Sequence, residues 1–136
     1  MDRNLQLLGI AKKAGLLAVG GDDVSAAARN GKARLIISAN DTSDGALRRA
    51  RMNAQTGGAV HIVAPYSKFE IGNITQRGSP GTLAITDAGL AAKFVSDLAR
   101  TDHEKYSDAA EQLTEIARIF SERKNKTPSG KRRSTQ

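Results

Sequence analysis

The chain has 136 residues, of which 39% are hydrophobic and 26% charged, and it carries a formal net charge of +7. This length suits one domain of ordinary size. Cysteine is absent, which excludes disulfides, thiolate metal sites and cysteine nucleophiles, and no apolar run approaches the roughly 20 residues of a membrane span. We therefore expect a cytoplasmic protein with no membrane partner.

The charge is distributed unevenly along the chain. Residues 1–95 hold 12 Lys/Arg and 7 Asp/Glu, residues 96–122 hold 3 and 7, and residues 123–136 hold 6 and 0. A basic core, an acidic segment and a basic end thus follow one another. Clustered positive charge indicates nucleic acid as a partner before acidic small molecules. The basic end lacks periodicity and is predicted to be disordered, serving either solubility or phosphate contacts.

Helical and strand patterns alternate over the first 100 residues. Strands of apolar and β-branched residues are predicted at 16–20, 33–39, 59–65 and 82–87, and those at 33–39 and 59–65 lack the alternation of a half-exposed strand. Helices are predicted between and around them, at 5–15, 22–31, 43–58, 66–75 and 88–100. This order favours an α/β fold, a three-layer α/β/α sandwich on a four-stranded mixed sheet.

A separable segment follows the alternating region. Apolar residues recur there at steps of three and four, and the intervening positions are largely acidic, which predicts an amphipathic helix over 101–122. Its apolar stripe is expected to pack on the domain, on a second copy or on a partner. The stripe consists of Tyr106, Ala109, Ala110, Leu113, Ile116, Ala117 and Phe120. The predicted organisation is a domain at 1–100, this helical extension at 101–122 and a basic tail at 123–136.

Two glycines, Gly20 and Gly21, and two aspartates, Asp22 and Asp23, stand where a strand turns into a helix. The spacing matches neither a Walker loop nor a dinucleotide-binding turn, and paired carboxylates oppose a phosphate at a helix N-terminus. The aspartates are expected to cap the helix and to favour its dipole. Glycine lets the backbone approach a ligand closely, and free N–H groups together with carboxylate oxygens can bind base edges.

Catalytic and metal chemistry find little support in the sequence. His61 lies inside an apolar strand and is expected to be a satisfied core side chain, and no serine stands in a nucleophile motif. A carboxylate cluster for a divalent ion, formed with Asp41 and Asp44, competes with the simpler role of helix caps for the same residues. We expect no enzyme, no cofactor and no metal site.

Four ordered blocks between about Leu5 and Leu98 resemble one family. The blocks are "LLGIAKKAGLLAVGGDDV", "RNGKARLIISANDTS", "YSKFEIG" and "TLAITDAGLAAKFV". They are similar to the L-seven-Ae/L-thirty-e ribosomal protein superfamily, and within it to the small bacterial proteins that bind kink-turn RNA. The resemblance implies the same α/β/α sandwich and a function in binding kink-turn or ribosomal RNA, in translation or on the ribosome, with ribonucleoprotein components as further partners.

The resemblance also implies which residues contact RNA. Gly20 matches the family glycine, and Asp22 and Asp23 stand where the family has an Asn–Glu pair that reads tandem sheared G·A pairs. Ala26 replaces a supporting lysine, and Ser79 stands where an arginine is common, with Arg77 nearby. Together with basic residues near the helix, the expected RNA-binding residues are Gly20, Gly21, Asp22, Asp23, Arg29, Lys32, Ser43, Lys68, Arg77, Gly78, Ser79 and Pro80.

Two alternatives remain at this level. The chain could be a structural subunit of a ribonucleoprotein that docks a protein partner through the helix at 101–122 and binds little RNA specifically. The same fold also occurs as the substrate-binding part of RNA ribose methyltransferases, although here only a helix and a tail follow it. Neither the bound RNA nor the oligomeric state follows from the sequence.

Overall fold

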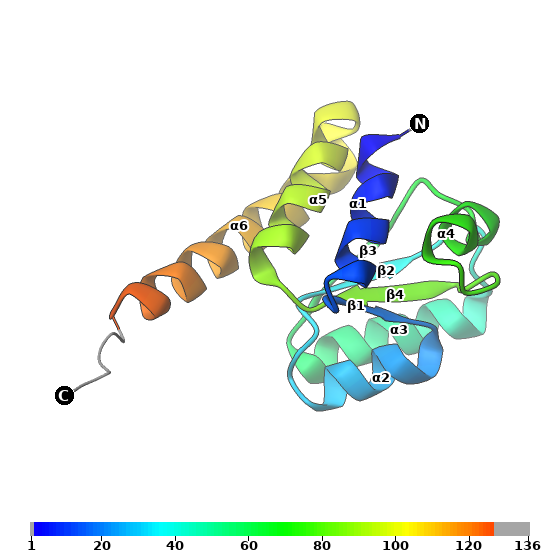
Figure 1. Cartoon of the computed structure of the whole chain (residues 1–136), viewed down its shortest axis with the longest axis horizontal. Coiled ribbons are helices and arrows are strands. Elements are labelled where there is room, and N and C mark those ends of the chain that lie inside the picture. The colour runs from blue at the N-terminus through cyan, green and yellow to red at the C-terminus, as the bar shows by residue number, and fades with distance from the viewer. Residues whose placement is uncertain (1, 127–136) are drawn as a thin grey trace.

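A computed structural model describes residues 2–126, which form a layered α/β body and a long C-terminal helix (Figure 1). The strands are β1 (Leu17–Val19), β2 (Leu35–Ser38), β3 (Val60–Val63) and β4 (Thr82–Ile85). The helices are α1 (Arg3–Lys13), α2 (Gly21–Arg29), α3 (Asp44–Gly57), α4 (Lys68–Thr75), α5 (Ala88–Thr101) and α6 (His103–Lys126).

The four strands form one sheet in the order β1-β4-β2-β3. β2 and β3 run parallel, whereas β4 is antiparallel to both β1 and β2. The mixed four-stranded sheet predicted from the sequence is therefore confirmed. In this topology β1, β2 and β3 end, and β4 begins, at the same edge. We call this the carboxyl edge of the sheet; it carries the segments 20–23, 39–43, 64–68 and 76–81.

Helices cover both faces of the sheet, which confirms the three-layer sandwich. α2 and α3 pack on one face through a small, alanine-rich cluster that includes Val24, Ala28, Ala50 and Ala54 (Figure 1). A larger core on the other face joins α1, α4, α5 and α6, with Phe94 among its fully buried side chains. All four residues of β2 are buried, the apolar Leu35, Ile36 and Ile37 and the polar Ser38, as expected for a strand covered on both sides.

The helix predicted at 101–122 is α6, and it packs along α5 as part of the main core. Leu113 is fully buried, and the hydroxyl of Tyr106 donates a hydrogen bond of 2.6 Å to the carbonyl of Val63. The apolar stripe thus packs on the domain over its first half. The helix continues to Lys126, four residues beyond the predicted boundary. Residues 127–136, with the disorder predicted for the tail, lie outside the described residues.

β3 differs from its prediction as a buried strand. It lies at one edge of the sheet, and of its four residues only Ile62 is buried, while the other three are partly exposed. An edge position explains this, because only one side of the strand is covered by a neighbour. Among the helices of residues 2–126, none has the length and apolar character needed to cross a membrane.

Candidate functional site

The carboxyl edge brings together four segments that are far apart in the sequence. The N–H of Gly20 donates to the carbonyl of Thr82 at 3.0 Å, which fixes the start of α2 beside the start of β4. The carbonyl of Gly81 accepts two hydrogen bonds, from the N–H of Ala39 and from the hydroxyl of Thr42, each at 2.8 Å. The loop before β4 is therefore held against both the β1–α2 and the β2–α3 connections.

The fourth segment, at the start of α4, joins the same cluster. The N–H of Lys68 donates to Oδ1 of Asp41 at 2.9 Å. A Cβ placed on Gly81 would lie 3.9 Å from Cδ of Lys68, so the lysine stem runs alongside the loop before β4. Ser43 completes this region as the N-cap of α3, where its hydroxyl accepts from the N–H of Ala46 at 3.2 Å. These bonds fix the positions of Asp41 and Ser43 at the carboxyl edge.

The start of α2 departs from the expected aspartate cap. Gly20 is the N-cap, with φ of 94° and ψ of 157°, and it offers no side-chain acceptor. Non-glycine residues rarely adopt this backbone conformation, so glycine is required at this turn. Asp22 and Asp23 are the second and third residues of the helix, where their negative charges interact favourably with the helix dipole but do not cap the helix. The N–H groups of the first turn therefore lack a side-chain partner, whereas α1, α3, α4 and α5 each have one.

Each aspartate of α2 faces an arginine from another segment. Asp22 pairs with Arg49 of α3 at 3.2 Å, and Asp23 pairs with Arg77 of the loop before β4 at 3.7 Å. All four side chains are more than half exposed, so each pair contributes only about 0.2–1 kcal/mol and exchanges readily for another partner. The pairs neutralise the carboxylates and hold two guanidinium groups at the same surface. Sequence reasoning missed Arg49, because only the packing of α2 on α3 brings it to Asp22.

The loop 76–81 rests directly on α4. A Cβ placed on Gly72 would lie 1.6 Å from the carbonyl oxygen of Gly78, which is far inside van der Waals contact. The loop therefore depends on glycine at this position of α4. Gln76 begins the loop in the left-handed conformation with φ of 58°, and Arg77, Gly78 and Ser79 are exposed. The loop presents its polar backbone and one guanidinium to solvent at the carboxyl edge.

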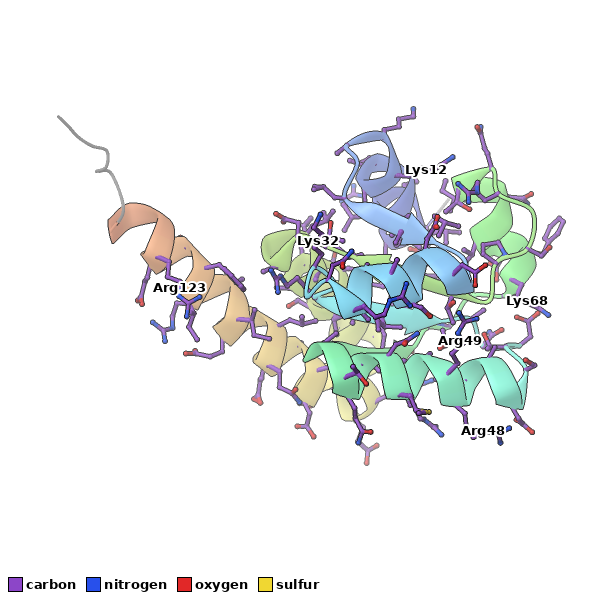
Figure 2. The ribbon with its side chains drawn as sticks, turned by 90° about the horizontal axis from the view of Figure 1, so that it is seen from below. Lys12, Lys32, Arg48, Arg49, Lys68 and Arg123 are labelled. Carbon is purple, nitrogen blue, oxygen red and sulfur yellow. The ribbon has the colours of Figure 1, made fainter. Side chains whose placement is uncertain are left out.

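The structure places most of the predicted RNA-binding residues in one region and separates two from it. Arg29 ends α2, about 12 Å along the helix axis from its start, and Lys32 follows in the turn that leads to the opposite edge of the sheet. Figure 2 shows Lys32 well apart from Lys68 and Arg49. The predicted residues that gather at the carboxyl edge are Gly20, Gly21, Asp22, Asp23, Ser43, Lys68, Arg77, Gly78, Ser79 and Pro80.

His61 lies outside this edge and forms a hydrogen bond within the fold. Nε2 of His61 lies 2.9 Å from the hydroxyl oxygen of Ser38, as expected for a satisfied histidine. Burial, followed by the positive charge of Arg51, lowers the pKa of His61. Within residues 2–126, no three histidine or carboxylate side chains come together as metal ligands would. At the carboxyl edge itself, Asp41, a candidate metal ligand in the sequence, accepts a hydrogen bond from the start of α4.

The comparisons with known proteins support the fold. No protein-family model matches the chain, and no curated sequence matches it. Among solved structures, a protein of unknown function from Bacillus halodurans is similar with a TM-score of 0.64 and 22% identity, over 71% of this chain and 96% of that one. The 15.5 kD RNA-binding protein of Giardia lamblia is similar with a TM-score of 0.56 and 18% identity, over 68% and 82%. The chain shares the fold of that RNA-binding protein. Sequence identities of 22% and 18% show a common fold and nothing more.

Proposed function

We propose that the protein binds structured RNA of the kink-turn type through the carboxyl edge of its sheet. The supporting observation is the convergence there of an uncapped helix start, two aspartates, two arginines and a lysine. N–H groups and carboxylate oxygens can bind the edges of bases, while the cations hold phosphates. The expected division of labour is Asp22 and Asp23 toward base amino groups, and Arg49, Arg77 and Lys68 toward the backbone.

The ion pairs explain how acidic residues can face RNA. In the free protein Arg49 and Arg77 neutralise Asp22 and Asp23, so the surface does not repel phosphate. On binding, the exposed guanidinium groups can turn to phosphates while the carboxylates accept hydrogen bonds from amino groups of bases. Breaking the two ion pairs costs little free energy, because exposed ion pairs are weak. Ser43 and Lys68 would line the place of an extruded base, with the loop 76–81 covering it.

Whether one substitution raises or lowers the affinity for RNA tests this proposal. Asp23→Ala removes a negative charge, so a protein that binds RNA only by charge should bind more tightly. If the carboxylate accepts from a base, the variant should instead lose about 1–3 kcal/mol, or roughly tenfold to a hundredfold, toward an intact kink-turn. Binding to a copy whose G·A pairs are replaced should not weaken. A filter-binding or anisotropy titration of both RNAs measures this directly.

Asp97→Ala is the matched control for this experiment. Asp97 also pairs with an arginine, Arg100, at 3.5 Å, and with Lys93 at 3.8 Å, but it belongs to α5, which is not one of the four segments at the carboxyl edge. The control should leave the preference for the intact kink-turn unchanged. A gain of affinity in both variants, equal for the two RNAs, would contradict base recognition by Asp23.

The alternative function, docking of a protein partner through the apolar stripe of α6, has less exposed apolar surface available than the sequence suggested. Tyr106, Ala110 and Leu113 of the apolar stripe are buried within the domain. Phe120 is partly buried, with the guanidinium of Arg34 4.5 Å from its ring centre. In the later turns of the stripe, Ile116 and Ala117 are partly exposed like Phe120. We therefore propose RNA recognition as the principal function.

A further inference from the structure

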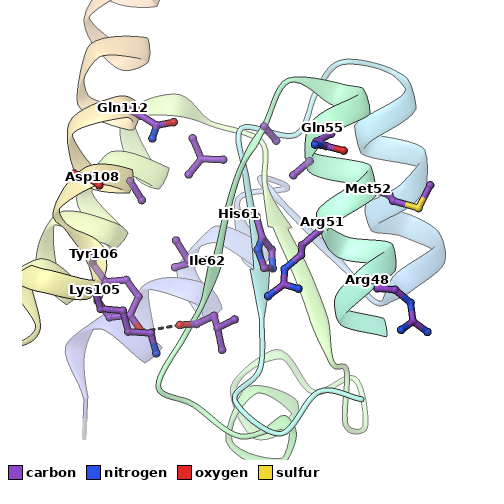
Figure 3. A pocket seen from close by; sticks show the side chains of 15 residues that line it. Arg48, Arg51, Met52, Gln55, His61, Ile62, Lys105, Tyr106, Asp108 and Gln112 are labelled. Atoms are coloured by element: carbon purple, nitrogen blue, oxygen red, sulfur yellow. Dashed lines mark hydrogen bonds between the residues drawn. The ribbon is translucent and has the colours of Figure 1, made fainter. Parts of the chain in front are cut away.

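A groove of about 840 Å³ lies between α3 and α6, away from the proposed RNA surface. Its floor is the edge strand β3, and Figure 3 shows side chains of both helices around it. α3 contributes the exposed side chains of Arg48, Arg51 and Met52, and α6 contributes Lys105 and Asp108. The groove is thus lined by the edge strand with its Val and Ile side chains, by Met52 of α3, and by mostly positive charge.

The backbone of β3 directs hydrogen-bonding groups into this groove. The N–H groups of Val60 and Ala64 donate to carbonyls of the β2 segment at 3.0 and 2.9 Å. Because N–H and C=O directions alternate along a strand, the corresponding groups of His61 and Val63 point away from β2. No strand within residues 2–126 pairs with that side of β3. A second chain could form hydrogen bonds with these groups.

Within the part of the chain that the structure describes, a side-chain hydrogen bond reaches this edge at one end. The hydroxyl of Tyr106 donates a hydrogen bond to the carbonyl of Val63. The N–H of Val63 and the N–H and carbonyl of His61 then face the groove. Proteins usually protect edge strands with proline, with charged residues on the strand or with a covering element. The β3 sequence Val-His-Ile-Val contains neither proline nor a permanently charged residue. Its middle therefore remains suited to pairing.

The charge of the groove selects the kind of partner. Neither Arg48 nor Arg51 forms an ion pair with any carboxylate of residues 2–126, in contrast to Arg49 on the same helix. Lys105 lies with its ammonium 5.3 Å from the centre of the Tyr106 ring and also lacks a carboxylate partner within that range. Asp108 is the one acidic residue that lines the groove. A bound segment would be stabilised by carboxylates of its own.

We propose that this groove binds an extended acidic segment of a partner protein, which pairs with β3 as a fifth strand of the sheet. The four residues of β3 span about 13 Å, so an added segment needs at least four residues to fill the edge. Side chains of an added strand alternate between the α3 wall and the α6 wall. The segment should therefore carry acidic residues toward Arg48 and Arg51, and small residues toward Ala109 of α6.

Labelled peptides test the proposal with the full-length protein. An octapeptide of alternating Glu and Thr should bind, and a Lys–Thr octapeptide should bind at least tenfold more weakly, as measured by fluorescence anisotropy. Two further Glu–Thr peptides carry N-methyl groups on alternate backbone nitrogens, one on the Glu residues and the other on the Thr residues. In the parallel direction one set of N–H groups faces β3 and in the antiparallel direction the other, so a peptide that binds in one direction should lose binding with one methylation pattern only. A third Glu–Thr peptide, methylated on every backbone nitrogen, should not bind in either direction.

Charge reversal and amide exchange complete the test. Arg51→Glu should weaken binding of the acidic peptide about tenfold, and Arg29→Glu, an exposed arginine at the end of α2, should not change it. The bound peptide should slow hydrogen exchange at the amides of His61 and Val63. Equal binding of acidic and basic peptides, or binding by the peptide methylated on every backbone nitrogen, would overturn the proposal. So would a single-stranded RNA that occupies the groove in an Arg51-dependent manner when the acidic peptide does not.

Discussion

Replacing Gly72 with alanine tests whether the loop 76–81 is built on α4 as the structure indicates. An added Cβ would lie 1.6 Å from the carbonyl oxygen of Gly78 and 2.7 Å from its carbonyl carbon. Both are backbone atoms, so the loop as a whole must retreat by about 2 Å to reach ordinary contact. The substitution therefore changes both stability and the shape of the carboxyl edge.

The expected loss of stability follows from two opposing effects. Overpacking of this kind costs about 3 kcal/mol at the upper end of its usual range, and alanine returns about 1 kcal/mol through its helix propensity. The net loss of about 2 kcal/mol should lower Tm by about 6–10 °C. Binding to a kink-turn should weaken as well, because the displaced loop no longer presents Arg77 beside Asp23.

Gly89→Ala provides the matched control. Gly89 also lies in a helix, α5, but a Cβ there would meet only an Asp87 carboxylate oxygen, at an ordinary 3.5 Å. This variant should be as stable as the parent or more stable by about 0.4–1 kcal/mol. Urea unfolding followed by circular dichroism measures both. A Gly72→Ala protein as stable as Gly89→Ala would refute the packing of the loop on α4.

Three further predictions concern α6 and the edge strand. Leu113→Ala should lower the free energy of unfolding by about 2–5 kcal/mol, because the side chain is fully buried; a loss below 1 kcal/mol in urea unfolding would mean that α6 is not part of the core. Tyr106→Phe removes the hydrogen bond to Val63 and should cost about 0.5–1.5 kcal/mol, with faster amide exchange at the start of α6. For His61, the folded-state pKa lies below the ordinary 6.5, so the unfolded state binds its proton first as the pH falls. The free energy of unfolding should therefore decrease from pH 7 to pH 5, and by less in His61→Gln; identical pH profiles would contradict this.

Local patterns explain how much of the fold is predictable from the sequence. Ser43 and Gly58 bound α3 as expected, since a serine cap and a left-handed glycine are determined by neighbouring residues alone. The apolar run Leu35, Ile36 and Ile37 of β2 likewise indicates a strand covered on both sides. The similar run at β3 is misleading, because strand order decides which strand lies at the edge, and strand order depends on the whole chain.

The candidate site likewise depends on tertiary packing that the local sequence does not determine. Glycine at position 20 was expected to give access to the backbone, but the cap assigned to the aspartates was wrong because the chain turns at Gly20 itself. The partners of Asp22 and Asp23 lie 27 and 54 positions away, so tertiary packing alone brings Arg49 and Arg77 to them. Arg29 was included in the predicted surface because it is basic and lies near the helix at 22–31, although α2 carries it to the far end of that helix.

The central claim is that the carboxyl edge reads RNA structure and does not merely attract RNA by charge. The most direct measurement is a titration of the full-length protein with a labelled kink-turn, and with a copy whose G·A pairs are replaced, at two salt concentrations. We predict a preference for the intact kink-turn that persists at the higher salt, since base contacts depend less on counterion release than phosphate contacts do. Equal affinity for the two RNAs, falling with the same steep salt dependence, would contradict the account.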